Sequence, residues 1–163
     1  MKLTHTFTNA YPQYSYFNIG VWKKYEKKIF DYAKSTCVGK STNAEFYAVT
    51  GLSDYKITST KNSAAKKSPA KFWPGGKLPA NIKAIKRAES MWTVGCCSWT
   101  SGASLNGESV SIWANNVVKG QDNEGHQPTL PVLAKKVYPA APKGFEFFPG
   151  NPQCSDAVHH HKF

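Results

Sequence analysis

Three side chains in the sequence have the types and the spacing to hold a hard metal cation. Asn18, Trp22 and Glu26 follow one another at intervals of four residues, which places them along neighbouring turns of a helix. Asn9 and Gln13 precede that helix and can converge on its first turn. Amide and carboxylate oxygens with retained waters suit Mg²⁺. The spacing also fits a structural role, in which Asn18 caps the helix, Glu26 pairs with a lysine and Gln13 satisfies the loop backbone.

The elements that must position these residues follow from the pattern of apolar side chains. Trp22, Tyr25, Ile29 and Ala33 recur at three- and four-residue steps, which predicts a helix over about 18–34. We expect strands at 3–8, 45–50, 90–98 and 108–114, a turn region at 101–107, and a short helix at 129–137. The lysine-rich stretch 53–88 is expected to be a loop or insertion, and 139–163 an irregular tail. The sequence therefore predicts one α+β domain over 1–163.

Positive charge is concentrated in one part of the chain. The 163 residues hold 21 Lys and Arg against 10 Asp and Glu, a net charge of +11. Fifteen basic and four acidic residues lie between 23 and 87, so this stretch carries the whole excess. Lysine neutralises phosphate as a point charge, which favours sequence-independent contact with a polyanion over base reading. The nearest phosphate-binding candidates are Lys23, Lys24, Lys27, Lys28 and Arg87, with the remaining lysines of 56–87 as a second surface. A simple solubility surface is the alternative.

The four cysteines indicate the compartment. Cys37, Cys96, Cys97 and Cys154 form no Cys-x-x-Cys pair of the kind that binds zinc. A bond between the adjacent Cys96 and Cys97 would be strained, so we expect each of them to reach either Cys37 or Cys154, in a pairing that the sequence leaves open. Two such bridges indicate an oxidising, secreted or lumenal context, whereas four reduced buried thiols are the alternative. No apolar run approaches the roughly 20 residues of a membrane span.

Five short sequence blocks, spread from residue 6 to residue 154, follow one another in a fixed order. They are Thr8-Asn9 with Pro12-Gln13; Asn18, Trp22 and Glu26; Tyr47-Ala48-Val49-Thr50-Gly51; Met91-Trp92-Thr93-Val94-Gly95-Cys96-Cys97; and Ser111-Ile112-Trp113-Ala114-Asn115-Asn116 with the late Cys154. This series resembles the DNA/RNA non-specific endonucleases of the ββα-metal nuclease superfamily. The Cys-Cys strand and the late cysteine resemble the secreted animal endonuclease-domain-containing branch.

The resemblance implies a fold, a cofactor and roles for individual residues. It implies an antiparallel sheet with a ββα-metal-type helix, long loops and disulfide staples. Asn18 would hold a single Mg²⁺ or another divalent cation, Glu26 would support its water shell, and Asn9 and Gln13 would line the cleft. In this family a histidine activates water for in-line attack on a phosphodiester, while the metal steadies the leaving oxygen.

The histidine of the family mechanism has no counterpart in this sequence. In the family it belongs to an Asp-Arg-Gly-His sequence on the strand before the Thr-Asn block. The 163 residues contain no such sequence, and only eight residues precede Asn9, so we expect the N-terminal part of the domain to be missing. His5 lacks the required neighbours, and His126 lies in a polar turn at 121–128. The run His159–His161 is either a tag remnant or an adventitious transition-metal site.

Three readings of this absence stay open. The chain is the C-terminal part of a split or processed nuclease whose companion chain supplies the histidine, or an inactive homologue without a metal, or an incomplete record of a longer polypeptide. The function predicted from the resemblance is Mg²⁺-dependent, sequence-nonspecific cleavage of DNA and RNA, with the general base absent from this chain. The competing class is a secreted basic protein that binds nucleic acid, acidic polysaccharide or mineral, or has a structural role.

Overall fold

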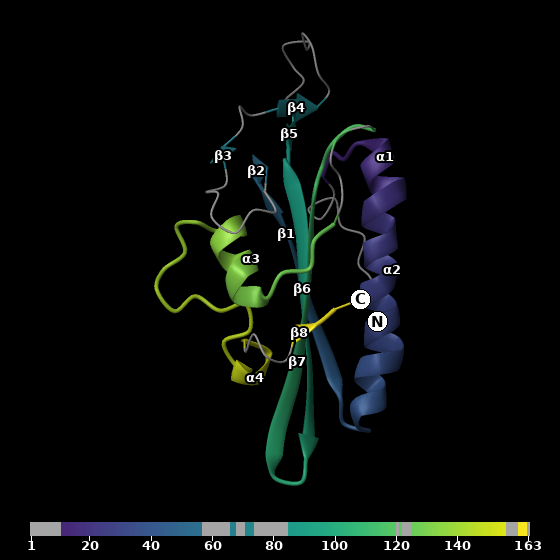
Figure 1. Cartoon of the computed structure of the whole chain (residues 1–163), viewed down its shortest axis with the longest axis vertical. Helices are drawn as coiled ribbons and strands as arrows, with labels where there is room; N and C mark the ends of the chain where they lie inside the picture. Colours follow the sequence, from purple (N-terminus) through teal and green to yellow (C-terminus); the bar gives the residue numbers. More distant parts are fainter. Residues whose placement is uncertain are drawn as a thin grey trace.

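The computed structural model describes residues 11–56, 66–67, 71–73, 85–119, 121, 125–155 and 160–162. The strand expected at 3–8 lies outside the described residues, as do Asn9, His5 and His159. Most of the lysine-rich stretch also lies outside them. Within the described residues the fold is a mixture of helices and mainly antiparallel strands, as the sequence predicts (Figure 1).

One long helical segment runs from Ser15 to Lys40. It begins after Tyr14, which is extended (φ −65°, ψ 134°), and it ends before Ser41, which is extended again (φ −169°, ψ 158°). The expected helix over 18–34 is therefore real but longer at both ends. Its successive parts are α1 (Ser15–Phe17), the π-helical η2 (Asn18–Trp22), α2 (Lys23–Asp31), the π-helical η3 (Tyr32–Cys37) and the 3₁₀ turn η4 (Val38–Lys40).

The two π-helical turns keep one face of this segment in register with the core. The buried residues Phe17 and Trp22 are five positions apart, and so are Tyr32 and Cys37. A spacing of five would turn the second residue away from the core in a regular α-helix. A π-helical turn closes on the fifth residue instead of the fourth. The π turns fall at these two places, so all four side chains reach the core.

The main sheet has the order β1-β6-β7-β8. β1 (Glu45–Ser53), β6 (Ser90–Ser101) and β7 (Ser104–Asn115) are antiparallel neighbours, and β8 (His160–His161) pairs in parallel with β7. β6 and β7 extend into the region 101–107, which was expected to be a turn. Only two residues lie between Ser101 and its partner Ser104, so the turn is shorter than expected. Gly102 (φ +60°) supplies the left-handed conformation that such a tight hairpin needs.

Two small ladders occupy part of the stretch that was expected to be a loop. β2 (Tyr55–Lys56) pairs with β3 (Lys66–Lys67), and β4 (Lys71–Trp73) pairs with β5 (Ile85–Arg87). Both ladders are antiparallel and separate from the main sheet. The described parts of this stretch are therefore hairpin-like extensions beyond the end of β1 and before the start of β6 (Figure 1).

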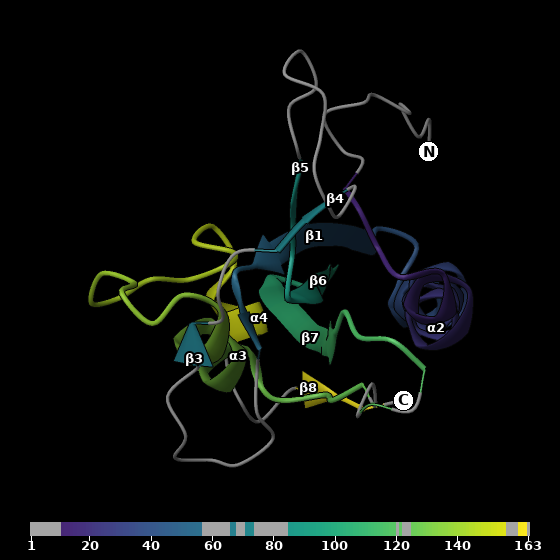
Figure 2. The same cartoon turned by 90° about the horizontal axis from the view of Figure 1, so that it is seen from above.

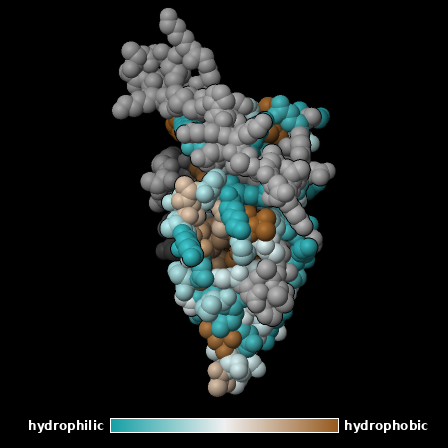
Figure 3. Space-filling model, turned by 60° about the vertical axis from the view of Figure 1, so that its left-hand side comes forward, coloured by the Kyte–Doolittle hydropathy of each residue, from teal (hydrophilic) through white to brown (hydrophobic). Residues whose placement is uncertain are grey.

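Helices cover both faces of the sheet. Figure 2 shows α2 on one side, with α3 (Leu130–Val137) and α4 (Pro152–Ser155) on the other. Side chains alternate along β7, so Ile112 packs towards α2 while Trp113 packs towards α3. α3 confirms the helix expected at 129–137. On its side, hydrophobic atoms remain visible between hydrophilic groups (Figure 3), and Val132 is 42% exposed. None of the helices in the described part of the chain is long and apolar enough to cross a lipid bilayer.

The two disulfides join different layers to the same strand. Cys37 at the end of the long helical segment is bonded to Cys97, and Cys154 in α4 is bonded to Cys96. Because adjacent residues on β6 point to opposite faces, Cys97 meets the helix on one face and Cys96 meets α4 on the other. The expectation of two bridges from the central pair is confirmed, and the structure resolves the pairing.

We predict that each disulfide contributes about 4 kcal/mol to the free energy of unfolding. The bridges join residues that are 60 and 58 positions apart, and closing loops of that length removes similar conformational entropy from the unfolded chain. The double variants Cys37→Ala/Cys97→Ala and Cys96→Ala/Cys154→Ala, measured by urea denaturation, should lose comparable stability. A variant as stable as the natural chain would contradict the entropic account for that bridge.

Candidate functional site

The π-helical turn η2 begins at Asn18 and ends at Trp22. Trp22 is 1% exposed and stacks on Phe17, with the ring centroids 5.7 Å apart. Asn18 is exposed, and its backbone N–H bonds to the carbonyl oxygen of Tyr14 at 2.9 Å, so it sits inside the helix and is not its cap. Its side-chain amide makes no hydrogen bond to any other described residue. Turns of this kind are frequent at functional sites, and here the turn presents a surface amide over a buried anchor.

Glu26 lies one turn further along, and Trp22 links it to the core. Burial raises the pKa of Glu26, and a hydrogen bond from the Trp22 indole partly offsets this effect. Burial, with a smaller contribution from the negative charge of Glu26, raises the pKa of Tyr11 to about 12. Tyr11, in the segment before the helix, is therefore within electrostatic range of Glu26. Within the described residues no ion pair joins Glu26 to a lysine, and Lys27 pairs instead with Asp31.

Gln13 has an unsatisfied oxygen. Its side-chain Oε1 is buried, and no described group donates a hydrogen bond to it. An acceptor left in this condition costs about 1–3 kcal/mol unless a donor or a cation meets it. The structural alternative, in which Gln13 satisfies the loop backbone, does not account for this oxygen. This oxygen therefore lacks a partner among the described residues, in the segment directly before the helix that carries Asn18 and Glu26.

A buried asparagine that the sequence reading did not single out holds this segment in place. Asn116 is 2% exposed, and its Oδ1 accepts a hydrogen bond from the Tyr14 N–H at 3.0 Å. Its Nδ2 donates to the carbonyl oxygens of Pro12 (3.2 Å) and Ala88 (3.0 Å). The residues on both sides of Gln13 are therefore tied to the end of β7. In the sequence, Asn116 stood out only as part of the block 111–116, one of the five blocks that carry the resemblance to a known family.

The candidate phosphate-binding residues lie in different surroundings. Lys23 is exposed, and Lys27 is held by Asp31 at 2.5 Å. Lys24 and Lys28 line a surface hollow beside α2, together with Gly125. The structure therefore places these lysines in different environments, although the sequence analysis treats them as one group of phosphate-binding candidates.

Arg87 is turned into the fold. Its side chain is 12% exposed, its guanidinium lies 4.2 Å from the centre of the Tyr14 ring, and its Nη2 is 3.9 Å from Glu89 Oε1. It therefore packs beside the segment that carries Gln13, away from the open lysine surface.

The two described histidine side chains are engaged elsewhere. His126 exchanges backbone hydrogen bonds with Trp113 (2.9 and 3.0 Å) and stacks on its ring at 4.3 Å, so the expectation of a simple solvated turn is wrong. His161 Nδ1 lies 3.5 Å from Glu108 Oε1. No group of three or more His, Cys, Asp or Glu in the described ranges is placed to hold a metal ion.

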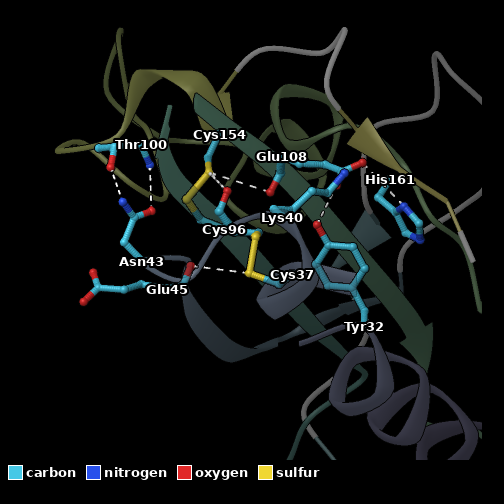
Figure 4. The surroundings of a disulfide bond; sticks show 11 residues. Tyr32, Cys37, Lys40, Asn43, Glu45, Cys96, Thr100, Glu108, Cys154 and His161 are labelled. Carbon is cyan, nitrogen blue, oxygen red and sulfur yellow. Dashed lines mark hydrogen bonds and ion pairs between the residues drawn. A yellow bond between two sulfur atoms is a disulfide. The ribbon is translucent and has the colours of Figure 1, made fainter. Parts of the chain in front are cut away.

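Glu108 is the centre of a polar cluster beside the disulfides (Figure 4). Tyr32 donates a hydrogen bond to it at 2.8 Å, and Lys40 Nζ lies 3.1 Å from the same oxygen. Burial alone would raise the pKa of Glu108, but Tyr32, Lys40 and the charge of His161 outweigh it and hold the pKa below its ordinary value. Burial and the contact with Glu108 raise the pKa of Tyr32. This cluster joins the helix, β7 and β8.

The family model of the DNA/RNA non-specific endonucleases matches residues 1–150 of the chain. The match covers most of the chain, so the chain belongs to the DNA/RNA non-specific endonuclease family. This family consists of divalent-metal-dependent nucleases. Searches of curated proteins and of solved structures each found no match.

We predict that Asn116→Ala lowers the free energy of unfolding by about 3 kcal/mol. The substitution leaves the Tyr14 N–H and the carbonyl oxygens of Pro12 and Ala88 without their side-chain partner; the bond to Ala88 is buried and the other two are partly buried. Asn106→Ala is the matched control, because Asn106 makes one exposed side-chain hydrogen bond, to Ser104, and should cost less than about 1 kcal/mol. Equal losses of unfolding free energy for the two variants in urea denaturation would show that Asn116 does not hold this segment in place.

We predict that the stability contributed by Glu108 depends on pH. Its pKa is lower in the folded than in the unfolded chain, so the contribution is complete above the unfolded pKa of about 4.3 and is lost as the pH falls through the folded pKa. The difference in unfolding free energy between the natural chain and Glu108→Gln should be constant from pH 7 to about 5 and should shrink below pH 4. The exposed Glu45→Gln controls for the change in net charge. A difference that grows in acid would contradict the assignment.

Proposed function

We propose that this chain is a Mg²⁺-dependent, sequence-nonspecific DNA/RNA endonuclease domain whose metal ligand is Asn18, with Glu26 in support. The observation that carries the proposal is the exposed Asn18 at the start of a π-helical turn that ends at the buried Trp22, one turn before Glu26. The family match over residues 1–150 supports the same assignment. Asn9, which is outside the described residues, and Gln13 are proposed to support the site.

The roles of the residues follow from their chemistry. Asn18 would hold the ion, and the Glu26 carboxylate would support the waters around it. The unsatisfied Gln13 oxygen can accept a bond from one of these waters or from the substrate. A bound Mg²⁺ supplies charge stabilisation to the leaving oxygen of a phosphodiester.

The general base is proposed to come from an Asp-Arg-Gly-His sequence outside these 163 residues, on a companion chain or in another part of a longer polypeptide. The 163 residues contain no such sequence, and the described histidine side chains are engaged with Trp113 and Glu108, on other elements than the start of the helix. We also propose that the protein is secreted, because two disulfides in one small domain are typical of oxidising compartments.

We predict that the chain alone cleaves plasmid DNA slowly or not at all, and that added imidazole restores Mg²⁺-dependent cleavage. A general base typically contributes 10²- to 10⁴-fold to the rate, and free imidazole can take its place. The rate should rise with the concentration of unprotonated imidazole in the natural chain but not in Asn18→Ala.

Metal binding provides a readout that does not depend on cleavage. Mg²⁺ binding measured by titration calorimetry should be lost in Asn18→Ala and retained in Asn106→Ala, which replaces an asparagine on the β6–β7 hairpin. Cleavage that survives EDTA, or Mg²⁺ binding that survives Asn18→Ala, would sink the proposal. Absence of any cleavage together with heparin binding as tight as DNA binding would favour the non-enzymatic polyanion binder.

A further inference from the structure

Two surface hollows flank the backbone segment 125–128. The first has a volume of about 340 Å³ and lies between this segment and α2, where Val21, Lys24, Tyr25 and Lys28 line it. The Tyr25 hydroxyl donates a hydrogen bond to the Gly125 carbonyl oxygen at 3.0 Å. A Cβ at position 125 would lie 1.9 Å from the Tyr25 ring, so only glycine allows this approach. The wall of the first hollow is therefore fixed by a close contact.

The second hollow opens on the other side of the same segment. It has a volume of about 330 Å³, and its rim includes Lys136 of α3 and Lys162 beyond β8. His126, Gln127 and Thr129 also line it. Each hollow falls near the lower end of the size range for small-ligand pockets, and each can take one charged group of a larger molecule.

The segment between the hollows is a rigid ridge. The backbone N–H groups of His126 and Trp113 each donate a hydrogen bond to the other residue's carbonyl oxygen, and the two rings stack. The Ser111 hydroxyl donates a hydrogen bond to the Pro128 carbonyl oxygen. Gly125 lines the first hollow and His126 lines the second, so the two hollows meet at neighbouring residues of the chain. A strand that follows this ridge would pass both hollows.

We propose that Lys24 and Lys28 on one side of the 125–128 ridge, and Lys136 and Lys162 on the other, form a second binding surface for the phosphodiester backbone of a polynucleotide, separate from the Asn18 site. Four lysines and no acidic side chain line the hollows within the described residues. The described lining of the two hollows contains lysine and no arginine, which suits binding without base recognition. Burial lowers the pKa of Lys136, and a bound anion would oppose this shift.

The surface extends from the helix that carries the proposed metal ligand. Lys24 and Lys28 lie within two residues of Glu26, on the same helix α2, so a strand on the ridge can continue towards the metal site. The identity of the polyanion rests on the proposed function. Its location rests on the charge and shape of the ridge alone. A bound strand would be held at two places, one for chemistry and one for retention.

The test is the binding of a 12-nucleotide single-stranded DNA, measured by fluorescence anisotropy in EDTA so that no cleavage occurs. Lys136→Gln/Lys162→Gln should weaken binding about 25-fold at 0.1 M salt and lower the slope of log K against log salt by about 1.4, because each single-strand phosphate contact contributes about 0.7. Lys24→Gln/Lys28→Gln should have a similar effect.

The matched control removes the same charge elsewhere. Lys27→Gln/Lys86→Gln replaces two lysines that already pair with Asp31 and Asp54 at 2.5 Å, and it should change the slope little. Equal effects of the control and ridge variants would overturn the proposal, as would ridge variants that lose heparin binding but keep DNA binding. Lys136→Gln/Lys162→Gln should retain Mg²⁺ binding in titration calorimetry, so failure of the metal site and failure of the ridge give different results.

Discussion

The alternation of side chains along β6 is the constraint on which the rest of the structure depends. Two adjacent cysteines on one extended strand must point to opposite faces of the sheet. Cys97 therefore holds the end of the long helical segment, and Cys96 holds α4. Since β6 is flanked by β1 and β7, the bridges fasten both helical layers to an inner strand. Glu108, on the neighbouring strand, reinforces the helix side through Tyr32 and Lys40.

The opposite end of the helix is positioned without covalent bonds. Trp22 is buried against the sheet, and Asn116 ties the segment before the helix to the end of β7. Polar groups that are buried and satisfied in this way are expensive to break one at a time. The proposed metal ligands are therefore carried on a helix that is fixed at both ends, and their geometry is set before any ion or substrate arrives.

The sequence was informative where a periodic pattern decides the structure. The apolar spacing of Trp22, Tyr25 and Ile29 predicted the helix, and strands were expected at 90–98 and 108–114, where β6 and β7 lie. The same reading placed the start of the helix at Asn18, because an asparagine is a common cap. It could not anticipate that Pro12 and Tyr14 would be held by Asn116, about a hundred residues away. Arg87 was assigned to the surface by its charge, whereas its contact with Tyr14 depends on the fold.

The π-helical turn between Phe17 and Trp22 can be regarded as a one-residue insertion into an ordinary helix. A chain shortened by one residue at this place would keep both aromatic rings in phase as a regular α-helix. The added residue leaves the core unchanged and alters only what the outside of that turn displays. The core therefore tolerates a change of length at this point. A change of length would, however, move Asn18, and any metal binding that depends on Asn18 would not tolerate it.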